Sequence, residues 1–176
     1  MLEKVKDWCR KYELLNKNDK IIVACSGGPD SLTLLSVLLK IRAEFNLELI
    51  VAHFNHMLRG IESDEDECFV KNYSKINNLK FCSMSVDIEE YCKSNKLSLE
   101  EGARIARYRF LRDVAAKYQT TKIAVGHNKD DQAETVLINL LRGAGSSGIA
   151  GISAKSCDII RPLLSITRIE IEEYCK

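Results

Sequence analysis

The stretch "VACSGGPDSLTLL", residues 23–35, places a pair of glycines between two apolar runs. The first run is typical of a buried strand and the second of a helix start, with a tight turn between them. Gly27 and Gly28 can adopt positive φ and let a ligand approach the backbone closely. Because the N–H groups of a helix N-terminus attract anions, residues 26–31 are a candidate phosphate-binding loop, the glycine loop.

Asp30 narrows the chemistry of the glycine loop. The loop has no lysine of the kind that a Walker loop requires, and it lacks the GxGxxG pattern of dinucleotide-binding domains. A carboxylate beside a polyphosphate repels it unless a divalent cation lies between them, so Asp30 suggests a Mg²⁺ ligand. The alternative is an ordinary strand-to-helix turn in which Asp30 caps the helix.

Strand and helix patterns alternate along the whole chain. Strands are predicted at residues 21–25, 49–54, 80–86, 122–126 and 159–163. Helices are expected after the glycine loop, from Ser63 to about Asn77 with Asp66 as a capping-box acid, from Ser98, at 130–141 and at 166–176. This alternation predicts a single α/β domain over residues 1–176, with a parallel sheet of about five strands and helices on both faces.

Composition limits the classes of function. A net charge of +1 gives no general basic field, so nucleic acid would need a local basic patch or further protein. The seven cysteines are odd in number and contain no C-x-x-C, which favours reduced thiols in a cytoplasmic protein over disulfides or structural zinc. No signal-peptide core or membrane-spanning apolar run is visible.

Two basic motifs lie at the end of the second predicted strand and within the helix predicted from Ser98. In "VAHFNHMLRG", residues 51–60, His53 and His56 could ligate a metal, but no nearby cysteine or carboxylate completes a tetrahedral site. Arg59 of this motif could meet an anion. In "EEGARIARYRF", residues 100–110, Arg104 and Arg107 share a helical face, which is either a binding face or a solvated one paired with Glu100 and Glu101.

An acidic motif follows the fourth predicted strand. In "VGHNKDDQAET", residues 125–135, Asp130, Asp131 and Glu134 are spaced to share a face near a helix start. Such a cluster could hold Mg²⁺ or orient an amine nucleophile, and His127 could contact phosphate or act as a general acid. The following "LLRGAGSSGI", residues 140–149, supplies Arg142 and either a mobile lid or a simple turn.

Taken in order, these motifs and the late "RPLL", residues 161–164, resemble the tRNA(Ile)-lysidine synthetase family of PP-loop ATP pyrophosphatases. The resemblance implies a Rossmann-like, adenine nucleotide alpha hydrolase-like fold in the cytoplasm. It implies that ATP adenylates C2 of the wobble cytidine in a CAU-anticodon tRNA(Ile), and that L-lysine then displaces AMP. Family members are longer and carry further tRNA-docking domains, so this chain is expected to be the catalytic part of a longer protein.

The resemblance also assigns residues. It implies nucleotide binding by Ser26, Gly27, Gly28, Pro29, Asp30, Ser31, His53, Arg104 and Gly126, catalytic roles for Asp30, Arg107, His127, Asp131 and Glu134, and Mg²⁺ ligation by Asp30 and Asp131. A homodimer stays open. The alternatives are a tRNA 2-thiolation enzyme, which typically uses paired cysteines, and an ATP-binding module without catalysis, which would not need the acidic motif.

Overall fold

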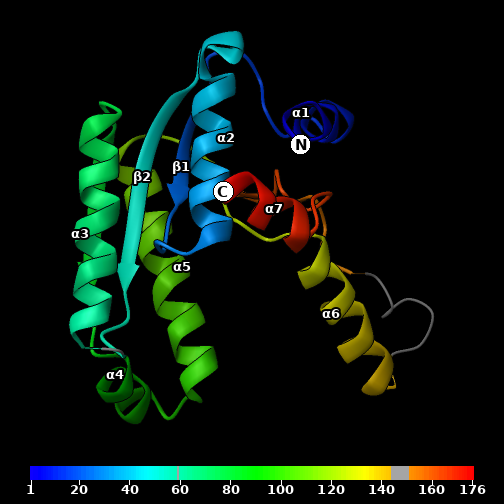
Figure 1. Ribbon diagram of the computed structural model, residues 1–176. Helices are drawn as coiled ribbons and strands as arrows, with labels where there is room; N and C mark the ends of the chain where they lie inside the picture. Colours follow the sequence, from blue (N-terminus) through cyan, green and yellow to red (C-terminus); the bar gives the residue numbers. More distant parts are fainter. Residues whose placement is uncertain (59, 144–150) are drawn as a thin grey trace.

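The computed structural model describes residues 1–58, 60–143 and 151–176, which form a layered α/β domain (Figure 1). A six-stranded sheet has the order β3-β2-β1-β4-β6-β5. Its strands are β1 (Lys20–Ala24), β2 (Glu48–Asn55), β3 (Lys80–Ser85), β4 (Lys122–Ala124), β5 (Lys155–Ser156) and β6 (Ile159–Ile160). The helices are α1 (Leu2–Lys11), α2 (Pro29–Phe45), α3 (Ile61–Ile76), α4 (Ile88–Asn95), α5 (Leu99–Lys117), α6 (Lys129–Leu141) and α7 (Arg168–Cys175).

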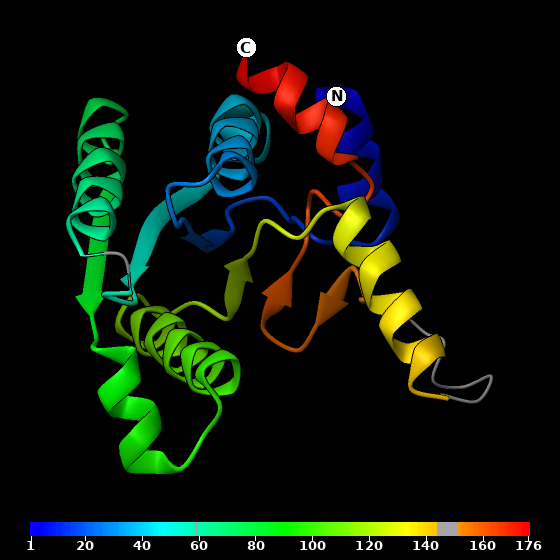
Figure 2. The same cartoon turned by 60° about the horizontal axis from the view of Figure 1, so that its bottom comes forward.

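The sheet separates two apolar cores because successive residues of a strand point to opposite faces. In β1, Ile21 and Val23 belong to the core shared with α1, α2, α3 and α7, whereas Ile22 belongs to the core shared with α4 and α5. Figure 2 shows α4 and α5 on one side of the sheet and α1, α2 and α7 on the other. Helix α6 has no buried residue and projects from this body (Figure 1).

The five predicted strands and the parallel sheet are confirmed, because β1, β2, β3, β4 and β6 all pair in parallel. The short β5, which pairs antiparallel with β6 at the edge, was not predicted. Helix α4 was not predicted either. The ends of the parallel strands β1, β2 and β4 converge on one edge, where ligands of such sheets bind.

The first residues and caps of the helices were predicted less accurately than the presence of the helices. Ser98 does cap α5, since its Oγ accepts a hydrogen bond from the N–H of Glu101 at 3.3 Å. The predicted Ser63 cap is wrong, because α3 already begins at Ile61 and its N-cap is Gly60. Helix α7 begins at Arg168, later than predicted, where Thr167 and Glu170 form a capping box.

The cysteines and the apolar character of the helices were also considered in the sequence. All seven cysteines are free. Over the described residues, no helix is both long enough and apolar enough to cross a lipid bilayer.

Gly102 provides a test of the packing between α4 and α5. A Cβ atom at this position would lie 2.2 Å from Sγ of Cys92. We therefore expect Gly102→Ala to lower the free energy of unfolding by about 1–3 kcal/mol, the usual cost of overpacking a core, as measured by urea denaturation. Adding Cys92→Ala removes the clashing sulfur and should restore part of the loss; a double variant no more stable than Gly102→Ala would contradict this explanation.

Candidate active site

The glycine loop connects the end of β1 to the start of α2 and is held together by Ser31. The buried Ser31 hydroxyl donates to the carbonyl oxygen of Gly28 at 2.9 Å and accepts from the N–H of Ser26 at 3.1 Å. Gly27 has φ +93°, a conformation that glycine adopts without strain. The Ser31 hydroxyl therefore shapes the loop from inside.

The start of α2 has the character of an anion site. Its N-cap is Gly28, which makes no side-chain capping bond, and Pro29 occupies the first turn. Asp30 is therefore inside the helix, and the alternative in which it caps the helix is wrong. The first N–H groups of α2 have no side-chain cap, which suits a phosphate.

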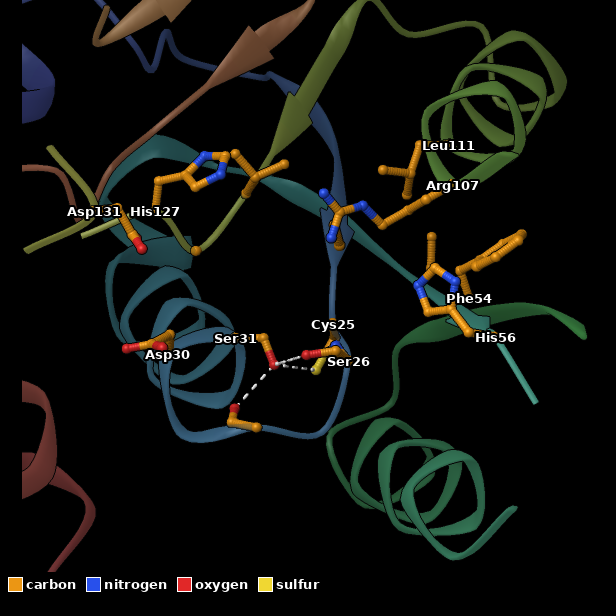
Figure 3. A pocket seen from close by; sticks show the side chains of 15 residues that line it. Cys25, Ser26, Asp30, Ser31, Phe54, His56, Arg107, Leu111, His127 and Asp131 are labelled. Atoms are coloured by element: carbon orange, nitrogen blue, oxygen red, sulfur yellow. Dashed lines mark hydrogen bonds between the residues drawn. The ribbon is translucent and has the colours of Figure 1, made fainter. Parts of the chain in front are cut away.

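A cavity of about 270 Å³ lies beside the glycine loop, at the ends of β1, β2 and β4 (Figure 3). Its polar lining includes several of the predicted site residues, namely Ser26, Gly28, Asp30, Ser31, Arg107, Gly126, His127 and Asp131. Its apolar lining consists of Ala24, Ala52, Phe54, Leu111 and Val125, to which Cys25 and His56 are added. The cavity therefore combines an apolar wall with charged groups.

Gly126 brings β4 close to the glycine loop. A Cβ atom here would lie 3.2 Å from the carbonyl carbon of Asp30 and 3.3 Å from the backbone nitrogen of Ser31. Such contacts are tight, so a side chain would press on the start of α2. Gly126 thus lets the loop and the end of β4 share one wall of the cavity.

The buried Asn128 ties Asp30 to Asp131. Its Nδ2 donates to Oδ1 of Asp30 at 3.1 Å, and its backbone N–H donates to Oδ2 of Asp131 at 2.7 Å. Its Oδ1 accepts from the backbone N–H groups of Asp130 and Asp131 at 2.8 and 3.1 Å. This capping box at the start of α6 fixes both carboxylates at the cavity (Figure 3 shows both). Sequence reasoning missed Asn128, although the N-x-x-D spacing was a visible capping signal.

The acidic motif is only partly assembled. Asp131 lines the cavity, but the Asp130 carboxylate accepts from the backbone N–H of Arg168 at 2.6 Å, and Glu134 is exposed and lies outside the lining. Among the described residues, no group of three or more His, Cys, Asp or Glu could hold a metal ion. Mg²⁺ typically needs only one or two carboxylates besides phosphates and water, so Asp30 and Asp131 fit such an ion.

Two histidines line the cavity and differ in the hydrogen bonding of their Nδ1 atoms. His127 Nδ1 accepts from Nε of Arg161 at 3.2 Å, and burial followed by the Arg161 charge lowers the pKa of His127. His56 has a buried Nδ1 with no hydrogen-bond partner among the described residues, and burial, Arg107 and His53 lower its pKa. Both imidazoles are therefore favoured in the neutral form at pH 7.

Arg104 and Arg107 of α5 line different cavities. Arg107 lines the first cavity, whereas Arg104 lines a second cavity of about 710 Å³ together with Arg109, Arg112 and Arg161. The guanidinium carbons of Arg104 and Arg107 lie 5.5 and 5.2 Å from the ring centroid of Tyr108. The ion pairs with Glu100 and Glu101 that belong to the alternative of a solvated face do not occur within the described part of the chain. The helical face is thus a boundary between two cavities.

Other predicted residues lie elsewhere. His53 is buried and its Nδ1 lies 2.9 Å from the carbonyl oxygen of Cys25, so it supports the end of β1 and does not line the cavity. Gly27 and Pro29 belong to the loop but are not part of the lining. Arg142 is exposed at the end of α6. Arg59 and the loop at 144–150 lie outside the described residues.

Comparison with known proteins identifies the domain. A family model described as a PP-loop domain matches residues 2–176. The chain belongs to the PP-loop family. PP-loop domains use ATP, which implies that this chain binds ATP.

Three curated relatives of this PP-loop domain have the same name. Those of Clostridioides difficile and Clostridium tetani are each 43% identical over the whole chain, and that of Geobacillus kaustophilus is 42% identical. Each is a tRNA(Ile)-lysidine synthase. The chain spans only 38% to 39% of the length of these relatives.

Solved structures agree on the fold. The U34-tRNA thiolase NcsA from Methanococcus maripaludis, with its [4Fe-4S] cluster, has a TM-score of 0.75 at 23% identity and matches 97% of this chain and 60% of its own. A glutamine-dependent NAD⁺ synthetase from Acinetobacter baumannii has a TM-score of 0.55 at 15% identity and matches 98% of this chain and 30% of its own. The adenine nucleotide alpha hydrolase-like fold is confirmed by these matches.

Proposed function

We propose that this PP-loop protein joins L-lysine to C2 of the wobble cytidine of a CAU-anticodon tRNA(Ile), with conversion of ATP to AMP and pyrophosphate. The observation that carries the proposal is the match of the whole chain to tRNA(Ile)-lysidine synthases at 42% to 43% identity. The cavity supports it, because a phosphate loop, two carboxylates and an apolar wall adjoin one another.

The first step is adenylation of the cytidine. The C2 oxygen attacks the α-phosphorus of ATP, the bond to the β-phosphate oxygen breaks, and pyrophosphate leaves with that electron pair. The uncapped N–H groups of α2 and the Arg107 guanidinium suit the negative charge that develops on the phosphates. Ala52, Phe54 and Leu111 offer an apolar surface for the adenine base.

Mg²⁺ would be held by Asp30 and Asp131, which Asn128 places at the cavity. A bound divalent cation neutralises phosphate charge at such a site. The capping box of α6 holds the Asp131 carboxylate in place, and the side chain of Asn128 holds the Asp30 carboxylate.

The second step is attack by the ε-amine of lysine on C2, with departure of AMP. Free lysine is protonated at pH 7 and must lose a proton before it can attack. The acids of α6, Asp131 at the cavity and Glu134 on the exposed helix surface, are the candidates that orient this amine or accept its proton.

The second cavity supports an RNA substrate. Arg104, Arg109 and Arg112 are exposed on α5 and line this cavity with Tyr108 and Arg161, next to the acids Glu101, Asp113 and Asp158. Arginine guanidinium groups and an aromatic ring are the groups with which proteins bind phosphates and stack the bases of single strands. Arg112 pairs with Asp158 at 2.8 Å, so Arg104 and Arg109 are the exposed arginines of this lining that make no ion pair within the described residues and could meet RNA phosphates. A homodimer and a cytoplasmic location remain part of the proposal.

A thiolation enzyme of the same fold is the second candidate, and Cys25 argues against it. Of the seven cysteines, Cys25 lines the first cavity, and burial raises the pKa of its thiol. Reactive cysteines have a lowered pKa, because the thiolate is the nucleophile. The sequence also contains no C-x-x-C pair.

Labelled lysine tests the proposed function. We expect the protein at its full natural length to transfer radioactive lysine to a CAU-anticodon tRNA(Ile) only when ATP and Mg²⁺ are present. A tRNA with uridine in place of the wobble cytidine serves as the control and should remain unlabelled. Lack of lysine transfer would refute the proposal, and incorporation of labelled sulfur in its place would establish the thiolation alternative.

A further inference from the structure

Arg161 is a buried cation that bonds to a histidine of the first cavity. It follows β6, is 8% exposed, and donates from Nε to His127 Nδ1 at 3.2 Å and from Nη1 to the carbonyl oxygen of Ser153 at 2.8 Å. Within the described residues no carboxylate pairs with this guanidinium. Because buried charges are costly without such a partner, its position beside His127 calls for an explanation in terms of the site.

The bond determines which nitrogen of His127 carries the proton. A guanidinium has only donors and stays protonated, so Nδ1 of His127 must be the acceptor. A neutral imidazole that accepts at Nδ1 carries its proton on Nε2. The imidazolium form would place two N–H donors against each other and is therefore disfavoured.

The surrounding charges act in the same direction. Burial, Arg161, Arg107 and Arg104 lower the pKa of His127, and Asp131 is the opposing charge. Asp131 already accepts a hydrogen bond from the backbone N–H of Asn128, which partly offsets the effect of its negative charge on His127. His127 lines the cavity, and Nε2 is the ring nitrogen that remains for a ligand there (Figure 3).

We propose that Arg161 is a positioning residue that holds His127 as its neutral Nε2–H tautomer, so that His127 donates a hydrogen bond to a phosphate oxygen of the nucleotide. The phosphate part rests on the proposed function, whereas the tautomer does not. His127 then serves as a fixed donor to the phosphates and not as the general acid that the sequence also allowed. A neutral donor suits a polyphosphate because it supplies a bond without a proton to lose.

Nitrogen NMR of the histidine rings tests the tautomer directly. The chain has three histidines, so the ring signals of His127 can be assigned by comparison with His127→Gln. At neutral pH we expect an unprotonated nitrogen shift at Nδ1 and a protonated one at Nε2. A proton on Nδ1, or on both nitrogens, would overturn the proposal whatever the variants do.

Arg161→Met tests the role of the arginine. We expect the Nδ1 and Nε2 shifts of His127 to move toward those of a mixed tautomer, while Arg161→Lys, which retains a donor-only cation, restores them in part. Arg112→Met is the matched control, because Arg112 lines the second cavity and pairs with Asp158 without a bond to His127. Unchanged His127 shifts in folded Arg161→Met would overturn the role of Arg161; if that variant does not fold, Arg161→Lys and the wild-type spectrum decide.

A nucleotide analogue separates this proposal from the proposed function. On addition of α,β-methylene ATP with Mg²⁺, the Nε2–H proton of His127 should shift while Nδ1 keeps its value. If the amide signals of the glycine loop shift but the His127 ring does not, the phosphate contact is refuted and ATP binding stands. If no signal of the glycine loop shifts, nucleotide binding in this cavity, and with it the proposed function, fails.

Discussion

Asp30→Asn is expected to slow pyrophosphate release by about 10²- to 10³-fold, the loss typical when one electrostatic group is removed from a preorganised site. In the wild type, Nδ2 of Asn128 donates to Oδ1 of Asp30 at 3.1 Å. An asparagine at position 30 keeps a side-chain oxygen that can accept this bond. The variant therefore removes the charge while it preserves the shape of the site. Pyrophosphate would be measured during modification of the CAU-anticodon tRNA at several Mg²⁺ concentrations.

Asp130→Asn is the matched control for this experiment. Asp130 lies next to Asp131 in the sequence, but its carboxylate accepts from the backbone N–H of Arg168 and does not line the cavity. We expect it to retain pyrophosphate release close to that of the wild type. Near-normal release by Asp30→Asn would remove Asp30 from the mechanism, and equal losses in both variants would indicate a general effect of acidic charge.

The glycine loop was predictable because its determinants are local. An apolar strand, two glycines and a helix start within residues 23–35 are enough to specify the turn, and Gly27 does adopt positive φ. The parallel sheet followed from the alternation of elements. Helix α4 and strand β5 were missed because each is short, and short elements depend on tertiary packing such as the close contact between Gly102 and Cys92.

The separation of Arg104 from Arg107 could not be read from their spacing. Residues three apart on a helix are neighbours, yet their directions differ by about 60°, since each residue turns the helix by about 100°. This difference in direction is enough for Arg107 to line the first cavity while Arg104 and Tyr108 line the second. A shared helical face was therefore a correct inference, but a shared ligand was not implied by it.

Arg161 and His127 show a second limit. They are 34 positions apart and meet only because β4 and β6 are neighbours in the sheet. The sequence contained "RPLL" as a motif without a chemical role, and "GH" as a motif with two alternative roles. The register of two parallel strands supplies the contact on which our proposed choice between those roles rests, and no periodicity within either motif carries that information.

Asn128→Asp is expected to slow pyrophosphate release by about 10- to 100-fold, as the loss of an outer-shell partner does in metal sites. Aspartate caps helices about as well as asparagine, so α6 should keep its start. The variant removes the donor to Asp30 and places a second carboxylate beside it, which raises the pKa values of the pair. Pyrophosphate release and urea denaturation would be measured together.

Asn128→Ala and Thr167→Ala separate the cap from the chemistry. Both residues form capping boxes, Asn128 for α6 and Thr167 for α7, so each alanine variant should lose about 1–2 kcal/mol of stability. Only Asn128 also bonds to Asp30 at the cavity, so only its variant should slow pyrophosphate release. Equal rates in Asn128→Asp and the wild type would mean that the carboxylates need no bridge. Equal losses of rate in the two alanine variants would mean that Asn128 acts through stability alone.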